Sequence, residues 1–401
     1  MAYSAPMSSL SPLGSLSRRL AALDARSRRR ILAPRAGVDF ASNDYLGLAS
    51  DPAIAAAIAD AAARGVPAGA GGSRLLRGNA PEHEALEEKA ARFFGAESAL
   101  FFSSGFAANA ALLATLPQPG DLIVADELIH ASVHEGIRLT RAAHVLAAHN
   151  DAAAVEDAIT GWRAGGGTGT VWIAIESVYS MDGDIAPLAD LVAVVDRHGA
   201  VLIVDEAHGT GIMGAGGRGL SAPYEGRENI IALHTCGKAM GVEGALVTGA
   251  AIVKDYLVNR ARGFIFSTAP SPLIAVAVGT AIDRIAAADD RRAALDDLRA
   301  HAGRAICVPL GLAAPVSPIL PIILGTDRRA MAVAADLQAA GFDIRGIRPP
   351  TVPAGTARLR ITLTLNITAA DIDALAPALT AALAANSGAA HPGTAHPGVA
   401  A

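Results

Sequence analysis

The chain has 401 residues, of which 52% are hydrophobic and 18% charged, and its formal net charge is -5 at pH 7. This length and composition predict a globular protein of about two domains. The acidic balance argues against nucleic-acid binding, which needs a basic surface, and no apolar run is long enough to predict a membrane span. Two cysteines, Cys236 and Cys307, are too few for a disulfide framework, so we expect a reducing, cytoplasmic location.

Both ends of the chain are unusual in composition. The amino-terminal segment carries many arginines among Ser and Ala, as organelle transit peptides do, but Asp24 interrupts the charge. We therefore predict an amphipathic helix around residues 16–31 in a mature arm. Residues 387–401 contain a repeated Ala-His-Pro-Gly sequence, which predicts a disordered tail.

Short apolar runs alternate with helical stretches, a pattern typical of a mostly parallel sheet with helices on both faces. Pro81 opens a helical segment with acidic residues in its first turn, and Gly95 ends it. A second helix is expected to end at His198 and Gly199. The predicted strands are 100–102, 122–125, 171–175, 201–204, 230–233 and 245–253.

The composition changes near Ala286, where a charged helix over 289–299 precedes two further predicted strands, 319–324 and 359–365. Pro321 in the first of these favours an edge position, because proline cannot donate to a neighbouring strand. We predict an α/β chain whose parts are an amino-terminal arm (1–45), a large domain with a mostly parallel central sheet (46–285), a smaller α+β domain (286–386) and the tail (387–401).

Three motifs point to other chemistry and fail on context. Residues 209–214 match the dinucleotide fingerprint, but the polar segment 205–208 separates them from the preceding strand and no helix start follows. Segment 205–208 also resembles the acidic box of ATPases, but the only Gly-Lys pair, at 237–238, lacks the rest of a phosphate loop. His130 and His134 lack the glutamate of a zinc motif and have no cysteine nearby, so we predict no metal site.

Lysine usage singles out one amine. Only Lys89, Lys238 and Lys254 are lysines among the 33 basic residues, and the others are arginines, which cannot form an imine. Lys238 and Asp205 each follow a predicted strand, so both are expected at the carboxyl edge of the sheet, where α/β proteins bind ligands. Taken singly, Lys238 fits a solvated turn and Asp205 fits a helix cap. Together they fit the amine and the acid that pyridoxal phosphate requires.

The same cofactor needs donors for its phosphate. Residues 103–106 follow a predicted strand and lead into an apolar helix over 107–116, so their backbone N–H groups would meet a phosphate at a helix amino terminus. Thr235 would add a hydroxyl, and His130 would lie flat on the cofactor ring. These residues predict Lys238 as the Schiff-base lysine.

The motifs together resemble the α-oxoamine synthases, which are fold type I pyridoxal-phosphate enzymes that condense an amino acid with an acyl thioester and release carbon dioxide. The resemblance spans roughly residues 39–366. It rests on segments 42–48, 71–78, 130–132, 180–184, 205–211 and 235–238.

Within that family, segments 72–79, 208–211 and 348–353 most resemble the branch of biotin biosynthesis that joins L-alanine to a pimeloyl thioester. Whether coenzyme A or an acyl carrier protein carries the acyl group stays open. So do two alternatives, a glycine-using member and a scaffold that binds without turnover. Cys236 and Glu243 depart from the family pattern, which affects the expected pocket shape but not the reaction.

The resemblance also implies roles for individual residues. The homodimer typical of the family would bring Ser267 and Thr268 of one subunit to the phosphate of the other. Our candidates for the distal carboxylate of the pimeloyl chain are Asn43 and an arginine of the amino-terminal arm, for which we choose Arg28. The remaining implied roles are ring stacking by His130, contact with the phenolic oxygen by Ser180 and His208, contact with ring nitrogen by Asp205, contact with ring and phosphate by Gly105, Phe106 and Thr235, and substrate binding by Asn43, Thr351 and Arg360.

Overall fold

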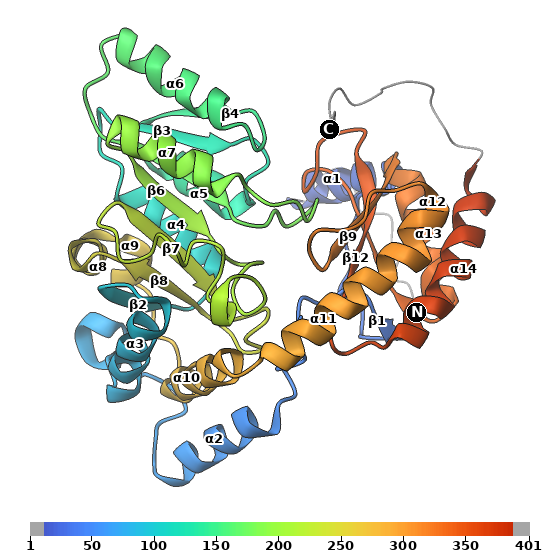
Figure 1. Cartoon of the computed structure of the whole chain (residues 1–401), viewed down its shortest axis with the longest axis horizontal. Coiled ribbons are helices and arrows are strands. Elements are labelled where there is room, and N and C mark those ends of the chain that lie inside the picture. Colours follow the sequence, from blue (N-terminus) through green and yellow to red (C-terminus); the bar gives the residue numbers. More distant parts are fainter. Residues whose placement is uncertain (1–11, 388–401) are drawn as a thin grey trace.

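The structure, a computed structural model, describes residues 12–387. Figure 1 shows two lobes. The large lobe is built around a seven-stranded sheet and the small lobe around a three-stranded sheet. The predicted tail lies outside the described residues except for Ser387. None of the helices within residues 12–387 is long and apolar enough to cross a membrane.

The seven-stranded sheet has the order β2-β8-β7-β6-β5-β3-β4, and the five strands from β7 to β4 run parallel. β8 is antiparallel to both of its neighbours. These findings confirm the mostly parallel sheet. The strands are β2 (Ser98–Phe102), β3 (Leu122–Asp126), β4 (Ala143–Ala147), β5 (Val171–Glu176), β6 (Val201–Asp205), β7 (Ile230–Thr235) and β8 (Ala245–Gly249).

Three strand predictions need correction. The strand predicted over 359–365 is β12 (Ala357–Thr362), which begins two residues earlier and ends three residues earlier. The run predicted as a strand over 245–253 ends at Gly249, and its second half begins helix α8 (Ala251–Arg260). β4 was not predicted, because four of its five residues are exposed at the edge of the sheet and give no buried apolar run.

Helices cover both faces of this sheet. α4 (Gly105–Thr115) and α5 (Ala131–Leu139) share one apolar core with it, while α6 (Ala152–Ala164) and α7 (Leu188–His198) share a second core. The predicted helix ends are present: Gly95 and Gly199 follow α3 and α7 in left-handed conformation, with φ of 80° and 58°. The other helices of the large lobe are α2 (Pro52–Ala63), α3 (Pro81–Phe94), α9 (Arg262–Ile265) and α10 (Pro272–Ala286).

The small lobe contains an antiparallel sheet of order β11-β12-β9. β9 is an edge strand, as Pro321 predicted. Figure 1 shows α11 running from the end of α10 across to this lobe. The elements are β9 (Ile319–Gly325), β11 (Arg345–Ile347), β12 (Ala357–Thr362), α11 (Asp289–Ala302), α12 (Val308–Leu310), α13 (Asp327–Ala339) and α14 (Ala369–Ala385).

The amino-terminal arm is tied into both lobes. Helix α1 (Gly14–Ala25) ends six residues before the predicted position 31. Downstream, β1 (Val38–Asp39) pairs in parallel with β10 (Phe342–Asp343). Phe40 and Tyr45 are fully buried in an apolar core that also contains residues of α3, α10 and β12. The exact domain boundaries stay a prediction.

Candidate active site

The candidate site forms where three parallel strands end. Glu176, Asp205 and Thr235 are the last residues of β5, β6 and β7, and Glu176 lies opposite Asp205 in the ladder. Lys238 follows Thr235 in the next turn. One cavity is lined by seven residues that the sequence predicted, namely Gly105, Phe106, His130, Asp205, His208, Thr235 and Lys238, and by Asn109, Glu176, Ala207 and Leu233.

A chain of hydrogen bonds holds Asp205 and His130 together. The buried Asn109 amide donates from Nδ2 to Asp205 Oδ2 at 2.6 Å and to Ser132 Oγ at 3.0 Å. Ser132 Oγ lies 2.8 Å from His130 Nδ1, and the Ser132 backbone N–H donates to the same nitrogen. The Ala207 N–H donates to Asp205 Oδ1. The carboxylate is therefore fixed on both oxygens, and the imidazole is oriented through the same network.

Two histidines of the cavity are neutral. Burial lowers the pKa of His130, and the Lys238 charge adds to this effect against the opposing charge of Asp205. Burial, with the charges of Lys238 and Arg360, holds the pKa of His208 well below its usual range. His208 Nδ1 lies 2.6 Å from the hydroxyl of Tyr45, whose own pKa is raised by burial. Tyr45 thus keeps its proton and fixes the His208 ring.

The amine and the second acid of the cavity have shifted pKa values. Burial lowers the pKa of Lys238, with a further contribution from Arg360, against the opposing charges of Asp205 and Glu176. Burial, together with the charge of Asp205, raises the pKa of Glu176 to about 8. Glu176 Oε2 accepts the Ser180 N–H, but Oε1 is buried and has no hydrogen-bond partner among residues 12–387. Near neutral pH, Glu176 therefore holds a proton beside Lys238.

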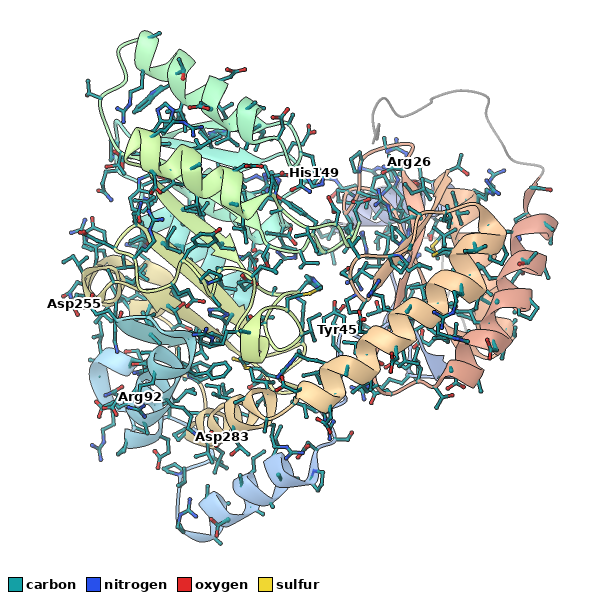
Figure 2. All side chains as sticks on the ribbon, viewed as in Figure 1. Arg26, Tyr45, Arg92, His149, Asp255 and Asp283 are labelled. Carbon is teal, nitrogen blue, oxygen red and sulfur yellow. The ribbon has the colours of Figure 1, made fainter. Side chains whose placement is uncertain are left out.

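Arg360 reaches this region from β12 in the small lobe. Its Nε donates to the Ser180 carbonyl at 2.5 Å, and its Nη1 donates to Asn43 Oδ1 at 3.0 Å and to Thr362 Oγ1 at 2.8 Å. Its Nη2 is buried and makes no hydrogen bond within the described chain. A buried guanidinium nitrogen with no acceptor is a ready donor for a substrate carboxylate. Figure 2 shows Tyr45, a further neighbour of Asn43, between the two lobes.

A second cavity adjoins the first at His130. Its volume of about 480 Å³ lies in the range of small-molecule sites, roughly 300 to 1,000 Å³. Ser180, Met181 and Asp182 line one part of it and Thr351 another. Because His130 lines both cavities, a ligand in the larger one would reach the group bound in the smaller one.

Five predicted residues line neither cavity. Arg360 contacts Ser180 of the larger cavity and Asn43 contacts Arg360, whereas the other three lie elsewhere. Ser267 and Thr268 are exposed and line a separate small pocket with Arg74 and Phe264. Within one subunit they do not line the Lys238 cavity, so their expected role depends on a partner subunit. The Arg28 side chain pairs with Asp327, with Nε 2.5 Å from Oδ2, and lines neither cavity.

The two departures from the family pattern are easily accommodated. Cys236 is fully buried and burial raises its pKa, so it acts as a packing residue. Glu243 is exposed beside Asp51 and Ile54 in another pocket and does not line the Lys238 cavity. Within residues 12–387, no group of three or more His, Cys, Asp or Glu side chains is arranged to bind a metal ion.

The residues present fit pyridoxal phosphate. Asp205, held by two donors, suits the ring nitrogen, and Lys238 is the only lysine that lines the cavity. α4 begins at Gly105, so its first N–H groups are available to a phosphate. The Thr235 hydroxyl lies close to these N–H groups, because a methyl group added to Gly105 would stand only 3.4 Å from Thr235 Oγ1.

Two lining residues were missed from the sequence although each leaves a signal there. Glu176 follows a predicted strand over 171–175 directly, just as Asp205 follows its strand. Asn109 is a polar residue inside the apolar helix predicted over 107–116, and it is almost fully buried. An acid at a strand end and an amide on an apolar helix are both expected to have partners.

The comparisons with known proteins decide the family. The sequence profile of the family described as aminotransferase class I and II matches residues 35–379. The chain belongs to this family. An 8-amino-7-oxononanoate synthase from Anaeromyxobacter dehalogenans is 41% identical over 91% of this chain and 94% of its own length. One from Azoarcus is 42% identical over 88% and 92%.

The solved structures agree. Serine palmitoyltransferase from Sphingomonas wittichii covers 95% of this chain and 99% of its own, at 29% identity and a TM-score of 0.84. An 8-amino-7-oxononanoate synthase from Francisella tularensis covers 88% and 99%, at 29% identity and a TM-score of 0.74. These matches confirm the predicted α-oxoamine synthase membership, the fold type I architecture and a family that depends on pyridoxal phosphate.

Replacement of Lys238 by Ala is expected to lower turnover by at least ~10³-fold, the order of a lost proton-transferring group, while the fold survives. Borohydride reduction of the holoenzyme followed by peptide mapping should place the cofactor label on Lys238. Lys89→Ala is the control, because Lys89 pairs with Asp283 at the surface. Label on Lys89 or Lys254 would overturn the assignment.

The raised pKa of Glu176 predicts a pH effect on stability. Since the folded-state pKa of about 8 exceeds the ordinary value of 4.5, the contribution to the free energy of unfolding is full below about pH 4.5 and is lost as the pH rises through about 8. In the protein freed of cofactor, Glu176→Gln should therefore flatten the fall of the melting temperature between pH 5 and 8. The exposed Glu228→Gln is the control. An unchanged slope in Glu176→Gln would contradict the buried proton.

Proposed function

We propose that this chain catalyses the pyridoxal-phosphate-dependent condensation of L-alanine with a pimeloyl thioester, which gives 8-amino-7-oxononanoate, carbon dioxide and the free thiol in biotin biosynthesis. The observation that carries the proposal is the identity of 41–42% to 8-amino-7-oxononanoate synthases over most of the chain. The geometry supports it independently. Lys238 in its cavity supplies an amine for the cofactor, and Arg360 Nη2, which has no partner among the described residues, can bind a substrate carboxylate.

The residues divide the work by position. Asp205 would keep a proton on the ring nitrogen of pyridoxal phosphate, which supplies the electron sink for the reaction when bound. His130 would stack on the ring, and Ser180 and His208 would contact the phenolic oxygen. Lys238, whose pKa is lowered, is the amine that removes a proton from the α-carbon of the amino acid.

The substrates occupy the two cavities. Arg360 binds the amino-acid carboxylate through Nη2, beside Asn43. The acyl chain lies in the larger cavity, between Thr351 and the 180–182 segment. His130 lies at the junction of the two cavities, so the thioester would meet the amino acid held at the cofactor there. Gly105, Phe106 and Thr235 would hold the phosphate of the cofactor.

The active unit is a homodimer. Three large apolar side chains of the large lobe are exposed: Leu76 is 87% exposed, Phe266 72% and Phe106 50%. Phe266 precedes Ser267 and Thr268, and Phe106 lines the Lys238 cavity. A partner subunit that covers them would bring its Ser267 and Thr268 to the phosphate. The two free, buried cysteines support a cytoplasmic location.

L-Alanine with a pimeloyl thioester is expected to be the best substrate pair. The Arg360 contact is common to all amino acids, so discrimination from glycine rests on one methyl group, worth about 1 to 3 kcal/mol or about 10- to 200-fold in kcat/KM. Release of thiol and of carbon dioxide measures the reaction. Faster turnover of glycine with a short acyl thioester would assign another branch, and no turnover with any pair would leave a binding scaffold.

Arg28→Ala is expected to raise KM for the pimeloyl thioester about tenfold, or about 1.4 kcal/mol, but not KM for a heptanoyl thioester, which lacks the distal carboxylate. Asp327→Asn breaks the same ion pair without removing the cation, so it should leave both values unchanged. Equal losses in both variants on both thioesters would show that Arg28 only holds the arm to α13.

A further inference from the structure

His149 lies outside both cavities and joins two carboxylates. It follows β4, and its Nδ1 lies 2.9 Å from Asp126 Oδ1, at the end of β3. Its Nε2 lies 2.7 Å from Asp184 Oδ2. Figure 2 shows His149 on the side of the large lobe that faces the small lobe. The Tyr179 ring packs edge-on against the imidazole, at 4.4 Å between centroids.

The bridge requires a charged imidazole. Ionised carboxylates only accept hydrogen bonds, so both ring nitrogens of His149 must donate. Burial alone would lower the pKa of His149, but the hydrogen bonds and charges of Asp126 and Asp184 raise it to about 10. The backbone N–H of His149 also donates to Glu127 Oε1. His149 is thus a cation throughout the physiological range, held between the end of β3 (Asp126 and Glu127) and the 178–185 segment (Asp184 and Tyr179).

Asp184 belongs to a loop that carries substrate-site groups. Residues 178–185 form a short hairpin: Val178 and Ile185 make a β-bridge, and the Tyr179 N–H donates to the Asp184 carbonyl. The tip, residues 180–182, lines the larger cavity. The Ser180 carbonyl accepts from Arg360 Nε at 2.5 Å. The loop therefore connects the His149 bridge at its base with the guanidinium at its tip.

A second arginine strengthens this connection to the small lobe. Arg358 Nη1 pairs with Asp182 at the tip and also lies 3.4 Å from the Met181 carbonyl. The base of the loop is held by His149 and by the Asn150 amide, whose Nδ2 lies 2.5 Å from Asp184 Oδ2. Displacement of Asp184 would thus move the Ser180 carbonyl, which sets the direction of the Arg360 guanidinium.

We propose that His149 is a positioning residue for amino-acid binding: by bridging Asp126 and Asp184 it fixes the 178–185 loop, and through the Ser180 carbonyl it aims Arg360 at the substrate carboxylate. This assignment rests on the proposed function, because it takes Arg360 as the carboxylate-binding group. His149 touches neither substrate nor cofactor, so its loss should weaken amino-acid binding more than it slows the chemical steps.

The test compares His149→Gln with wild-type holoenzyme. The expected result is an increase of about tenfold in KM for L-alanine with kcat within about twofold, since binding geometry and not the reacting groups is altered. Titration of the holoenzyme with L-alanine, followed by cofactor absorbance, should show the same increase in the dissociation constant. His198→Gln is the matched control, because His198, the last residue of α7, pairs with Glu156 of α6 at 3.0 Å and lines neither cavity.

Rescue separates positioning from general damage. In the double variant His149→Gln/Asp184→Asn, the two amides can hydrogen-bond to each other without an unpaired carboxylate, so L-alanine binding should recover to within about threefold of wild type. Unchanged binding in His149→Gln would overturn the proposal. The proposal would also be wrong if His149→Gln lowered kcat as strongly as it raised KM for L-alanine and the double variant restored neither value.

Stability against pH gives a readout independent of turnover. The groups facing His149 are Asp126, Glu127, Asp184 and Tyr179. Because the pKa of His149 is raised to about 10, its contribution is full below about pH 6.5 and is lost as the pH rises through about 10. The gap in melting temperature between wild type and His149→Gln should therefore narrow from pH 6 to pH 10, and a constant gap would contradict the charged bridge.

The proposed function and this inference fail separately. If wild type does not turn over L-alanine with the pimeloyl thioester, yet His149→Gln weakens amino-acid binding in the titration and the double variant restores it, the reaction assignment is wrong and the positioning role stands. If wild type makes the product and His149→Gln binds L-alanine normally, only the positioning role is wrong.

Discussion

The site depends on the parallel alignment of β5, β6 and β7. In a parallel ladder, neighbouring strands lie about 4.8 Å apart and their carboxyl ends meet at one edge. Glu176, Asp205 and Thr235 therefore stand side by side, and Lys238 joins them after a short turn. β8 is antiparallel to β7 and β2, so the end of β2 and the start of α4 return to the same edge.

Two carboxyl groups and an amine share one buried cavity, where an unpaired charge is costly. The surrounding residues give the two carboxyl groups different numbers of hydrogen bonds. Asp205 accepts hydrogen bonds from Asn109 and Ala207 on its two oxygens. One oxygen of Glu176 accepts nothing, and burial with the Asp205 charge raises the pKa of Glu176 to about 8. Similar carboxyl groups at adjacent strand ends thus have different hydrogen-bond environments.

The small lobe completes the site through arginine. Arg358 and Arg360 extend from β12 to the 178–185 loop of the large lobe. Planar guanidinium groups suit this task, because each can donate to several carbonyl and carboxylate oxygens at once. Arg360 Nε and Arg358 Nη1 donate to the loop, and Arg360 Nη1 donates to Asn43. The orientation of the remaining Arg360 Nη2 therefore depends on how firmly the loop is held.

The sequence by itself predicted the mostly parallel sheet and the place of Lys238 and Asp205 at the carboxyl edge of its strands. Buried apolar runs ending in Asp205 or preceding Lys238 leave a local signal, and the family motifs added the site residues around them. The exposed β4, the helical second half of 245–253 and the early end of α1 were not predicted correctly, because partial burial weakens the periodic signal. Only the tertiary structure placed Asn109 beside Asp205, paired Arg28 with Asp327 and set His149 between two carboxylates. Such partners are 23 to 299 residues apart, and their ionisation follows from burial and from neighbours in space, neither of which a local pattern contains.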